Sequence, residues 1–134
     1  ADISRAFVEG HKFNSEQKKL YQMATNQINH NAALIKAGLS FKEFVKKSWK
    51  LPEPYYGNRY SCMVHGIGLC DEWPMIKYPT DEGQQGGQFE KDMTVTVESY
   101  IGEVGGKEGV KLEQQYLVGE NGLELLSHHP LEDL

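Results

Sequence analysis

The sequence predicts an α+β domain in which helices pack on a mostly antiparallel sheet. Apolar residues recur at helical spacing between residues 14 and 52, whereas they alternate with polar residues between residues 93 and 126. A run of helices followed by a run of strands is typical of this fold class. The chain has 134 residues, the size of one domain with a core of its own. We therefore expect residues 1–134 to form a single domain.

The first helix is expected to begin after Asn14 and to end at Gly38. Asn14 and Gln17 have the spacing of a capping box, in which each side chain binds the backbone N–H of the other residue. Apolar residues follow at helical spacing from Leu20 to Ile35, and a glycine commonly ends a helix. This pattern indicates a helix that packs against the core.

A second, shorter helix is expected between Ser40 and Pro52. Ser40 and Glu43 again have the spacing of a capping box, and proline stops a helix. Residues 52–60 and 77–92 are rich in turn-forming and polar residues, so we expect loops there.

The clearest strand pattern covers residues 93–101, where apolar and polar side chains alternate. A second strand is expected at residues 110–118. The Gly-Glu-Asn-Gly sequence at 119–122 then predicts a hairpin turn, and residues 123–126 a return strand. Residues 2–8 also have strand character.

Composition limits the partners of the chain. The net charge of −5 argues against nucleic acid or an anionic membrane as the partner. No apolar run approaches the length that spans a bilayer. The only cysteines, Cys62 and Cys70, are expected to be buried free thiols in a reducing cytoplasm, although a thiolate ligand is an alternative.

The stretch MVHGIGLCDEWP combines the groups of a metal site or a proton-transfer site. His65 precedes Gly66 and Gly68, and Asp71 and Glu72 follow closely. Glycine allows a close approach of backbone, and imidazole with carboxylates binds metals or moves protons. The alternative is a structural histidine held by hydrogen bonds.

Two further carboxylates lie on consecutive predicted strands. An antiparallel pairing would bring Glu98 and Glu113 side by side, where they would repel each other unless a cation lies between them. Together with Asp2 and His65 they would form a site without thiolate, which favours Mn, Fe, Co or Zn. The alternative is that both glutamates face solvent and pair with Lys or Arg.

Four segments in order, ADISRAF, HGIGL, VES and KLEQQYLVGENG, resemble the C-terminal part of the catalytic domain of the creatinase, aminopeptidase P and prolidase ("pita-bread") family. The resemblance implies helices packed on a curved, mostly antiparallel sheet. It also implies that residues 1–134 are a partial catalytic domain that lacks the N-terminal half.

The same resemblance implies a set of metal ligands. The family holds two metal ions with two Asp, one His and two Glu residues, and Asp2, His65, Glu98 and Glu113 match four of these. The other Asp of the family would precede Asp2 and is not in this chain. We therefore expect a weakened, mononuclear site for a divalent transition metal, with Asp2 frayed at the terminus.

The segment RYSCMVHGIGLCDEWP resembles most closely the dimethylsulfoniopropionate (DMSP) lyases of this fold. In those enzymes a Tyr before the His and an Asp after it act on the substrate, and Tyr60 and Asp71 match both offsets. The peptidases of the family carry a second His where this chain has Glu72. The resemblance thus implies a C–S lyase that forms dimethyl sulfide and acrylate, with an Xaa-Pro metallopeptidase or a non-catalytic fragment as alternatives.

The residues suit an elimination. Asp71 would remove the proton next to the substrate carboxylate, and a bound metal would stabilise the developing negative charge. Tyr60, Trp73 and Tyr56 would offer aromatic faces to a sulfonium cation, although ordinary packing is the alternative for these residues. Besides a small-molecule substrate, we expect a homodimer, because an unpaired strand edge and an uncovered apolar face favour self-association.

Overall fold

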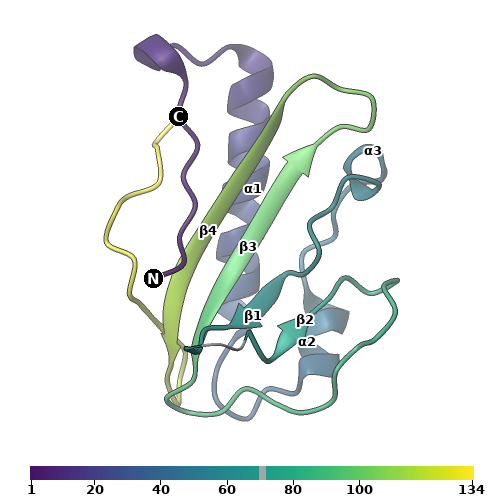
Figure 1. Cartoon of the computed structure of the whole chain (residues 1–134), viewed down its shortest axis with the longest axis vertical. Helices are drawn as coiled ribbons and strands as arrows, with labels where there is room; N and C mark the ends of the chain where they lie inside the picture. The colour runs from purple at the N-terminus through teal and green to yellow at the C-terminus, as the bar shows by residue number, and fades with distance from the viewer. Residues whose placement is uncertain (70–71) are drawn as a thin grey trace.

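The computed structural model describes residues 1–69 and 72–134. Cys70 and Asp71 therefore lie outside the described residues. The two predicted helices precede the three predicted strands along the chain (Figure 1). The elements are a 3₁₀ turn (Glu9–His11), α1 (Ser15–Leu34), α2 (Phe41–Lys47), α3 (Glu53–Tyr56), β1 (Val64–Gly66), β2 (Met75–Ile76), β3 (Thr94–Gly102), β4 (Gly109–Val118) and β5 (Leu123–Leu125).

The five strands form one sheet in the order β2-β1-β3-β4-β5, and every neighbouring pair is antiparallel. Figure 1 shows α1 behind β3 and β4, so that it covers one face of the sheet. The register of β3 and β4 places Glu98 directly opposite Glu113. The prediction of an α+β fold with a mostly antiparallel sheet is confirmed.

Helix α1 begins at the predicted capping box. The side chain of Asn14 accepts the backbone N–H of Gln17 at 2.8 Å, and the Gln17 side chain accepts the N–H of Asn14 at 3.0 Å. These two bonds satisfy backbone donors that the first turn of a helix leaves without partners. None of the described helices, α1 included, has the length and apolar character needed to cross a bilayer.

The prediction that this helix ends at Gly38 is wrong, because α1 ends at Leu34. The backbone N–H groups of Ala37 and Gly38 donate instead to the carbonyls of Gly119 and Phe89, at 3.0 and 2.8 Å. Gly38 has a φ of +86°, which favours glycine. Hydrogen bonds to distant segments thus replace the last helical turn.

The strand character of residues 2–8 does not produce a regular strand. Ser4 alone forms a β-bridge, with Glu113 in β4, through backbone bonds of 3.3 and 3.1 Å. The segment lies beside β4 (Figure 1). It is held there by the Arg5 guanidinium, which donates to the Glu113 carbonyl, to the Gln114 side chain and to the His129 carbonyl of the C-terminal tail.

Strands β1 and β2 are not predicted by the sequence pattern, because they contain only three and two residues. Helix α3 likewise lies inside the segment predicted as a loop. The expected close approach of backbone is present at Gly66, where a Cβ atom would lie 1.9 Å from the carbonyl oxygen of Trp73. Glycine at this position therefore allows β1 to pack against the segment that follows it.

The alternation predicted for β3 is present, and both faces of the strand are buried. Val95, Val97 and Ser99 lie on the α1 face, where the Ser99 hydroxyl donates to Gln27 of α1 at 2.7 Å. Thr96 and Glu98 lie on the opposite face, and both are at most 1% exposed. The two faces therefore differ in chemistry, with an apolar core on one side and polar groups on the other.

The packing of α1 on the sheet predicts a large loss of stability for Ile28→Ala. Ile28 is fully buried in the core, and deleting its side chain leaves a cavity, so the free energy of unfolding should fall by about 2–4 kcal/mol. Asn26→Ala on the exposed face of α1 is the control and should change it by less than about 0.5 kcal/mol. Urea unfolding measures both, and equal effects would contradict the packing described.

Candidate metal centre

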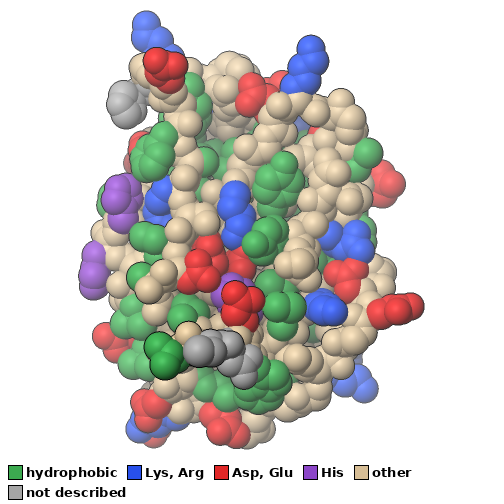
Figure 2. Space-filling model, viewed as in Figure 1, with side chains coloured by type: hydrophobic (Ala, Val, Ile, Leu, Met, Phe, Trp, Pro, Cys, Tyr) green, Lys and Arg blue, Asp and Glu red, His purple; other side chains and the backbone are tan. Residues whose placement is uncertain are grey.

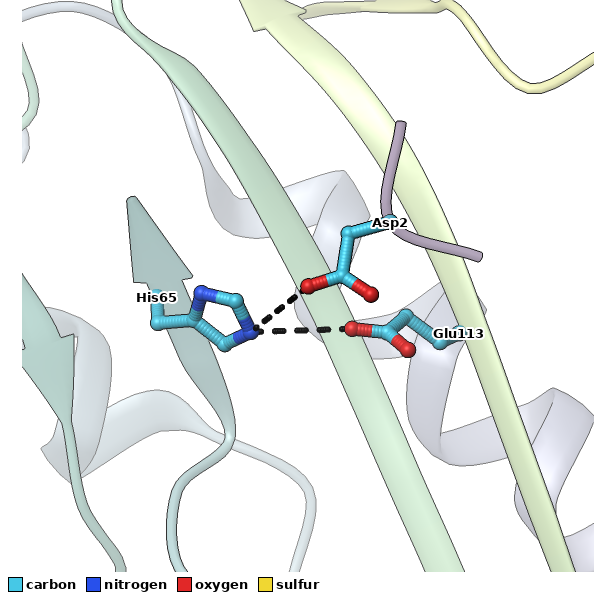
Figure 3. Close-up of side chains that lie close together, drawn as sticks. All are labelled: Asp2, His65 and Glu113. Carbon is cyan, nitrogen blue, oxygen red and sulfur yellow. Dashed lines mark ion pairs between the residues drawn. The ribbon is translucent and has the colours of Figure 1, made fainter. Parts of the chain in front are cut away.

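Four side chains meet on the face of the sheet opposite α1. His65 comes from β1, Glu98 from β3 and Glu113 from β4, three strands that are neighbours in the sheet. Asp2 joins them from the segment beside β4. Figure 3 shows Asp2, His65 and Glu113 pointing toward one another, and Figure 2 shows acidic and histidine side chains together near the middle of this face.

The His65 Nε2 atom lies at the centre of this group. It is 2.7 Å from Glu98 Oε1, and 3.6 Å from both Asp2 Oδ2 and Glu113 Oε1. One ligand atom each from Asp2, His65 and Glu113 lies within 4.8 Å of the other two. The Asp2 side chain is 46% exposed, whereas the other three are at most 6% exposed. The structure thus brings together all four residues proposed as ligands.

The orientation of the imidazole suits a ligand. His65 Nδ1 lies 2.9 Å from the carbonyl oxygen of Gly66, which can accept the Nδ1–H bond. A backbone acceptor on one ring nitrogen leaves the other nitrogen free for a metal, an arrangement common in metal-binding histidines. Here it directs Nε2 at the carboxylates.

Both oxygens of Glu113 are held by hydroxyl groups. The Thr96 hydroxyl donates to Oε1 and the Ser4 hydroxyl donates to Oε2, each at 2.8 Å. The Lys111 ammonium contacts Oε2 of both Glu98 and Glu113. The alternative in which the two glutamates face solvent is wrong, because they are 1% and 3% exposed, although Lys111 does pair with both.

The electrostatics of the site favour a proton or a cation at Nε2. Burial tends to lower the pKa of His65, but contacts with Glu113 and Glu98 outweigh burial and raise the pKa to about 10. Burial tends to raise the pKa of Glu113, but His65, Lys111 and Thr96 outweigh it and lower the pKa to about 2. A metal at Nε2 would replace the imidazole proton.

The donor set fits a divalent transition metal. Three carboxylates and one imidazole suit Mn, Fe, Co or Zn, and these residues do not distinguish among the four metals. Burial first, and then the Glu98 charge, raise the pKa of Cys62 to about 12, so this residue is a buried neutral thiol in the metal-free chain.

Tyr60 lies at the wall of this site. A cavity of about 100 Å³ is lined by Tyr60, His65 and Glu98 among others. His65 and Glu72 also line a wider hollow of about 690 Å³, which continues along residues 66–69. The two cavities share Asp2, His65 and Glu72 in their linings.

The other proposed substrate residues lie differently. Trp73 is half exposed and its ring meets the edge of Phe41, with centroids 6.2 Å apart. The Tyr56 hydroxyl lies 2.7 Å from the Thr80 hydroxyl, and its ring packs against Tyr78. Asp71 lies outside the described residues. Of the three aromatic side chains, Tyr60 is the one that lines the cavity.

Among the described residues, sequence reasoning missed three whose side chains contact the carboxylates of Glu98 and Glu113. They are Ser4, Thr96 and Lys111. Thr96 and Lys111 could have been found from the sequence, because residues two apart in a strand share a face. Thr96 stands two before Glu98, and Lys111 two before Glu113.

The model of Metallopeptidase family M24 matches residues 1–120. The dimethylsulfoniopropionate lyase DddP of Roseovarius nubinhibens is 37% identical over 113 residues, which are 83% of this chain and 25% of that protein. DddP of Roseobacter denitrificans is 34% identical, with 98% of this chain and 30% of that protein covered. The chain thus spans between a quarter and a third of the length of these relatives.

Solved structures of similar fold include an X-Pro aminopeptidase from Thermotoga maritima, which is 26% identical to this chain and has a TM-score of 0.72. The match covers 98% of this chain and 36% of that chain. The dipeptidase PepE from Mycobacterium ulcerans has a TM-score of 0.77 at 20% identity, covering 98% of this chain and 34% of that one. The second likeness concerns the fold alone. The predicted likeness to the aminopeptidase P and prolidase fold is confirmed.

The geometry predicts that the chain binds a divalent metal through His65. After loading with Mn²⁺ and dialysis, elemental analysis should find bound metal in the unaltered chain and none in His65→Ala, because Nε2 is the shared contact of the three carboxylates. His30→Ala, which removes an exposed histidine of α1, is the matched control and should keep its metal. Equal metal content in both variants would contradict this placement.

The hydroxyl bonds of Thr96 and Ser4 to Glu113 predict that removing either one weakens metal binding. Thr96→Val and Ser4→Ala should each weaken Mn²⁺ binding about 10-fold, because groups that orient a ligand contribute 10- to 100-fold to affinity. Thr94→Val is the control, since its hydroxyl donates to the Ile67 carbonyl instead. Isothermal titration measures the three affinities, and an unchanged affinity in Thr96→Val would refute this role.

Proposed function

The chain belongs to metallopeptidase family M24, and from this we propose that it contributes to a metal-dependent enzyme in which Asp2, His65, Glu98 and Glu113 bind a divalent metal ion. The proposal is supported by the convergence of their side chains on His65 Nε2. Two points stay predictions. One is that the metal is Fe, Mn, Co or Zn, and the other is that this chain binds a single ion.

For the reaction, we propose the cleavage of DMSP into dimethyl sulfide and acrylate. The observation that carries this proposal is the identity of 37% and 34% to two proteins that are both named dimethylsulfoniopropionate lyase, over 83% and 98% of the chain. Because the chain spans between a quarter and a third of those proteins, the activity of a whole enzyme is part of the proposal.

The elimination would need a base and a source of positive charge. A carboxylate base, proposed from the sequence to be Asp71, takes the proton from the carbon next to the substrate carboxylate. The electrons of that C–H bond form the new double bond, the C–S bond breaks, and its electron pair leaves with sulfur as dimethyl sulfide. A bound metal would supply positive charge that polarises the substrate carboxylate.

Tyr60 would orient the substrate. The nearby Glu98 carboxylate raises the pKa of Tyr60, which keeps the hydroxyl protonated and able to donate a hydrogen bond. The Lys111 ammonium lies over one face of this ring, 4.1 Å from its centroid, and the other face would be offered to a sulfonium cation. Trp73, half exposed, and Tyr56 are weaker candidates for such a contact, because their rings meet Phe41 and Tyr78.

A second candidate is an Xaa-Pro peptidase. The likeness to the X-Pro aminopeptidase from Thermotoga maritima, at 26% identity and a TM-score of 0.72, favours it. The resemblance to the peptidases would require a second histidine at the position of Glu72, which lines the hollow beside His65. Glu72 does not supply the imidazole that the peptidases place at this position, so we favour the lyase.

The lyase proposal predicts release of dimethyl sulfide from DMSP, lost in Asp71→Ala. The assay uses the metal-loaded chain and a chimaera in which it replaces the matching quarter of the Roseovarius relative, with gas chromatography as the readout. Asp92→Ala, an exposed loop carboxylate, is the control and should leave the rate unchanged.

Either of two results would refute the lyase. One is hydrolysis of Xaa-Pro dipeptides without dimethyl sulfide. The other is a folded, metal-binding chimaera that acts on neither substrate, which would support the alternative of a non-catalytic segment.

A further inference from the structure

Lys111 is a cation built into the candidate metal centre. It lies on β4 two residues before Glu113, and its side chain is 26% exposed. Its Nζ atom bonds to Glu98 Oε2 and lies 3.4 Å from Glu113 Oε2. The same atom stands 4.1 Å from the ring centroid of Tyr60. One ammonium group thus joins two candidate ligands to a candidate substrate residue.

The carboxylates present different oxygens to His65 and to Lys111. Glu98 and Glu113 both direct Oε1 at His65 Nε2, and both direct Oε2 at the ammonium. Lys111 therefore lies on the side of these carboxylates away from the imidazole. This placement lets both glutamates contact Lys111 and a metal at Nε2 through separate oxygens.

Lys111 changes the charge that an arriving metal meets. The carboxylates of Asp2, Glu98 and Glu113 carry three negative charges, and once a metal has displaced the imidazole proton Lys111 lowers the total to two. In the part of the chain that the structure describes, no other Lys or Arg forms an ion pair with these carboxylates. With a neutral imidazole, one divalent ion balances the remaining charge.

We propose that Lys111, through its contacts with Glu98 and Glu113, sets the charge of this centre so that a divalent cation is favoured over a trivalent one. The proposal rests on the metal-binding function proposed above. The ammonium is attracted to the three carboxylates, and a bound ion cancels part of that attraction. Because the cancelled part scales with the charge of the ion, Lys111 opposes a trivalent ion more than a divalent one.

If Lys111 only held the carboxylates in place, its loss would weaken metal binding instead of strengthening it. Loss of a group that only orients ligands weakens metal binding, and it does so for ions of either charge. Loss of a repelling charge strengthens binding, and strengthens it more for the ion of higher charge. The two roles can therefore be separated by measuring affinities for two ions.

The test measures dissociation constants for Mn²⁺ by isothermal titration and for Tb³⁺ by luminescence, at one pH and ionic strength. Lys111→Gln removes the charge but keeps an N–H donor, and Lys111→Met is a second neutral variant should the first not fold. Lys111→Arg keeps the charge. Lys91→Gln, which breaks an exposed ion pair with Glu120, is the matched control.

Neutral variants should bind Mn²⁺ about 10-fold and Tb³⁺ about 30-fold more tightly, because the repulsion grows with the charge of the ion. Lys111→Arg and Lys91→Gln should match the unaltered chain. Weaker or equal binding of both ions by the neutral variants would overturn the proposal and leave the metal site standing. Mn²⁺ binding that persists in His65→Ala would overturn both.

Discussion

The structure depends on one constraint, the burial of two carboxylates opposite each other. The antiparallel register of β3 and β4 sets Glu98 beside Glu113, and both side chains are almost fully removed from water. Buried like charges are unfavourable unless cationic groups lie between or beside them. His65 and Lys111 take those places on opposite sides of the pair. The chemistry proposed for this face follows from that arrangement.

The fold positions this cluster through segments far apart in the chain. Helix α1 covers the other face of the sheet, which leaves the polar face of β3 and β4 for the site. The backbone bridge of Ser4 to Glu113 sets the N-terminal segment beside β4, and Arg5 ties it to the C-terminal tail. Asp2 reaches His65 because of these contacts, although its side chain is the most exposed of the four.

Local patterns in the sequence predict the parts that depend on local structure. The capping box of Asn14 and the alternation along β3 both appear as expected, and the alternation places Glu98 on the polar face. The end of α1 could not be predicted, because Gly38 donates to Phe89, a residue far along the chain. The position of Trp73 against Phe41 likewise depends on tertiary packing. Lys111 was within reach of the same alternation rule but was missed.

Anomalous X-ray diffraction from crystals of the Mn²⁺-loaded chain locates a bound ion independently of activity. We expect an anomalous peak beside His65 Nε2, within coordination distance of the carboxylates of Asp2, Glu98 and Glu113. An ion bound elsewhere, with the His65 ring still hydrogen-bonded to Glu98, would contradict this expectation.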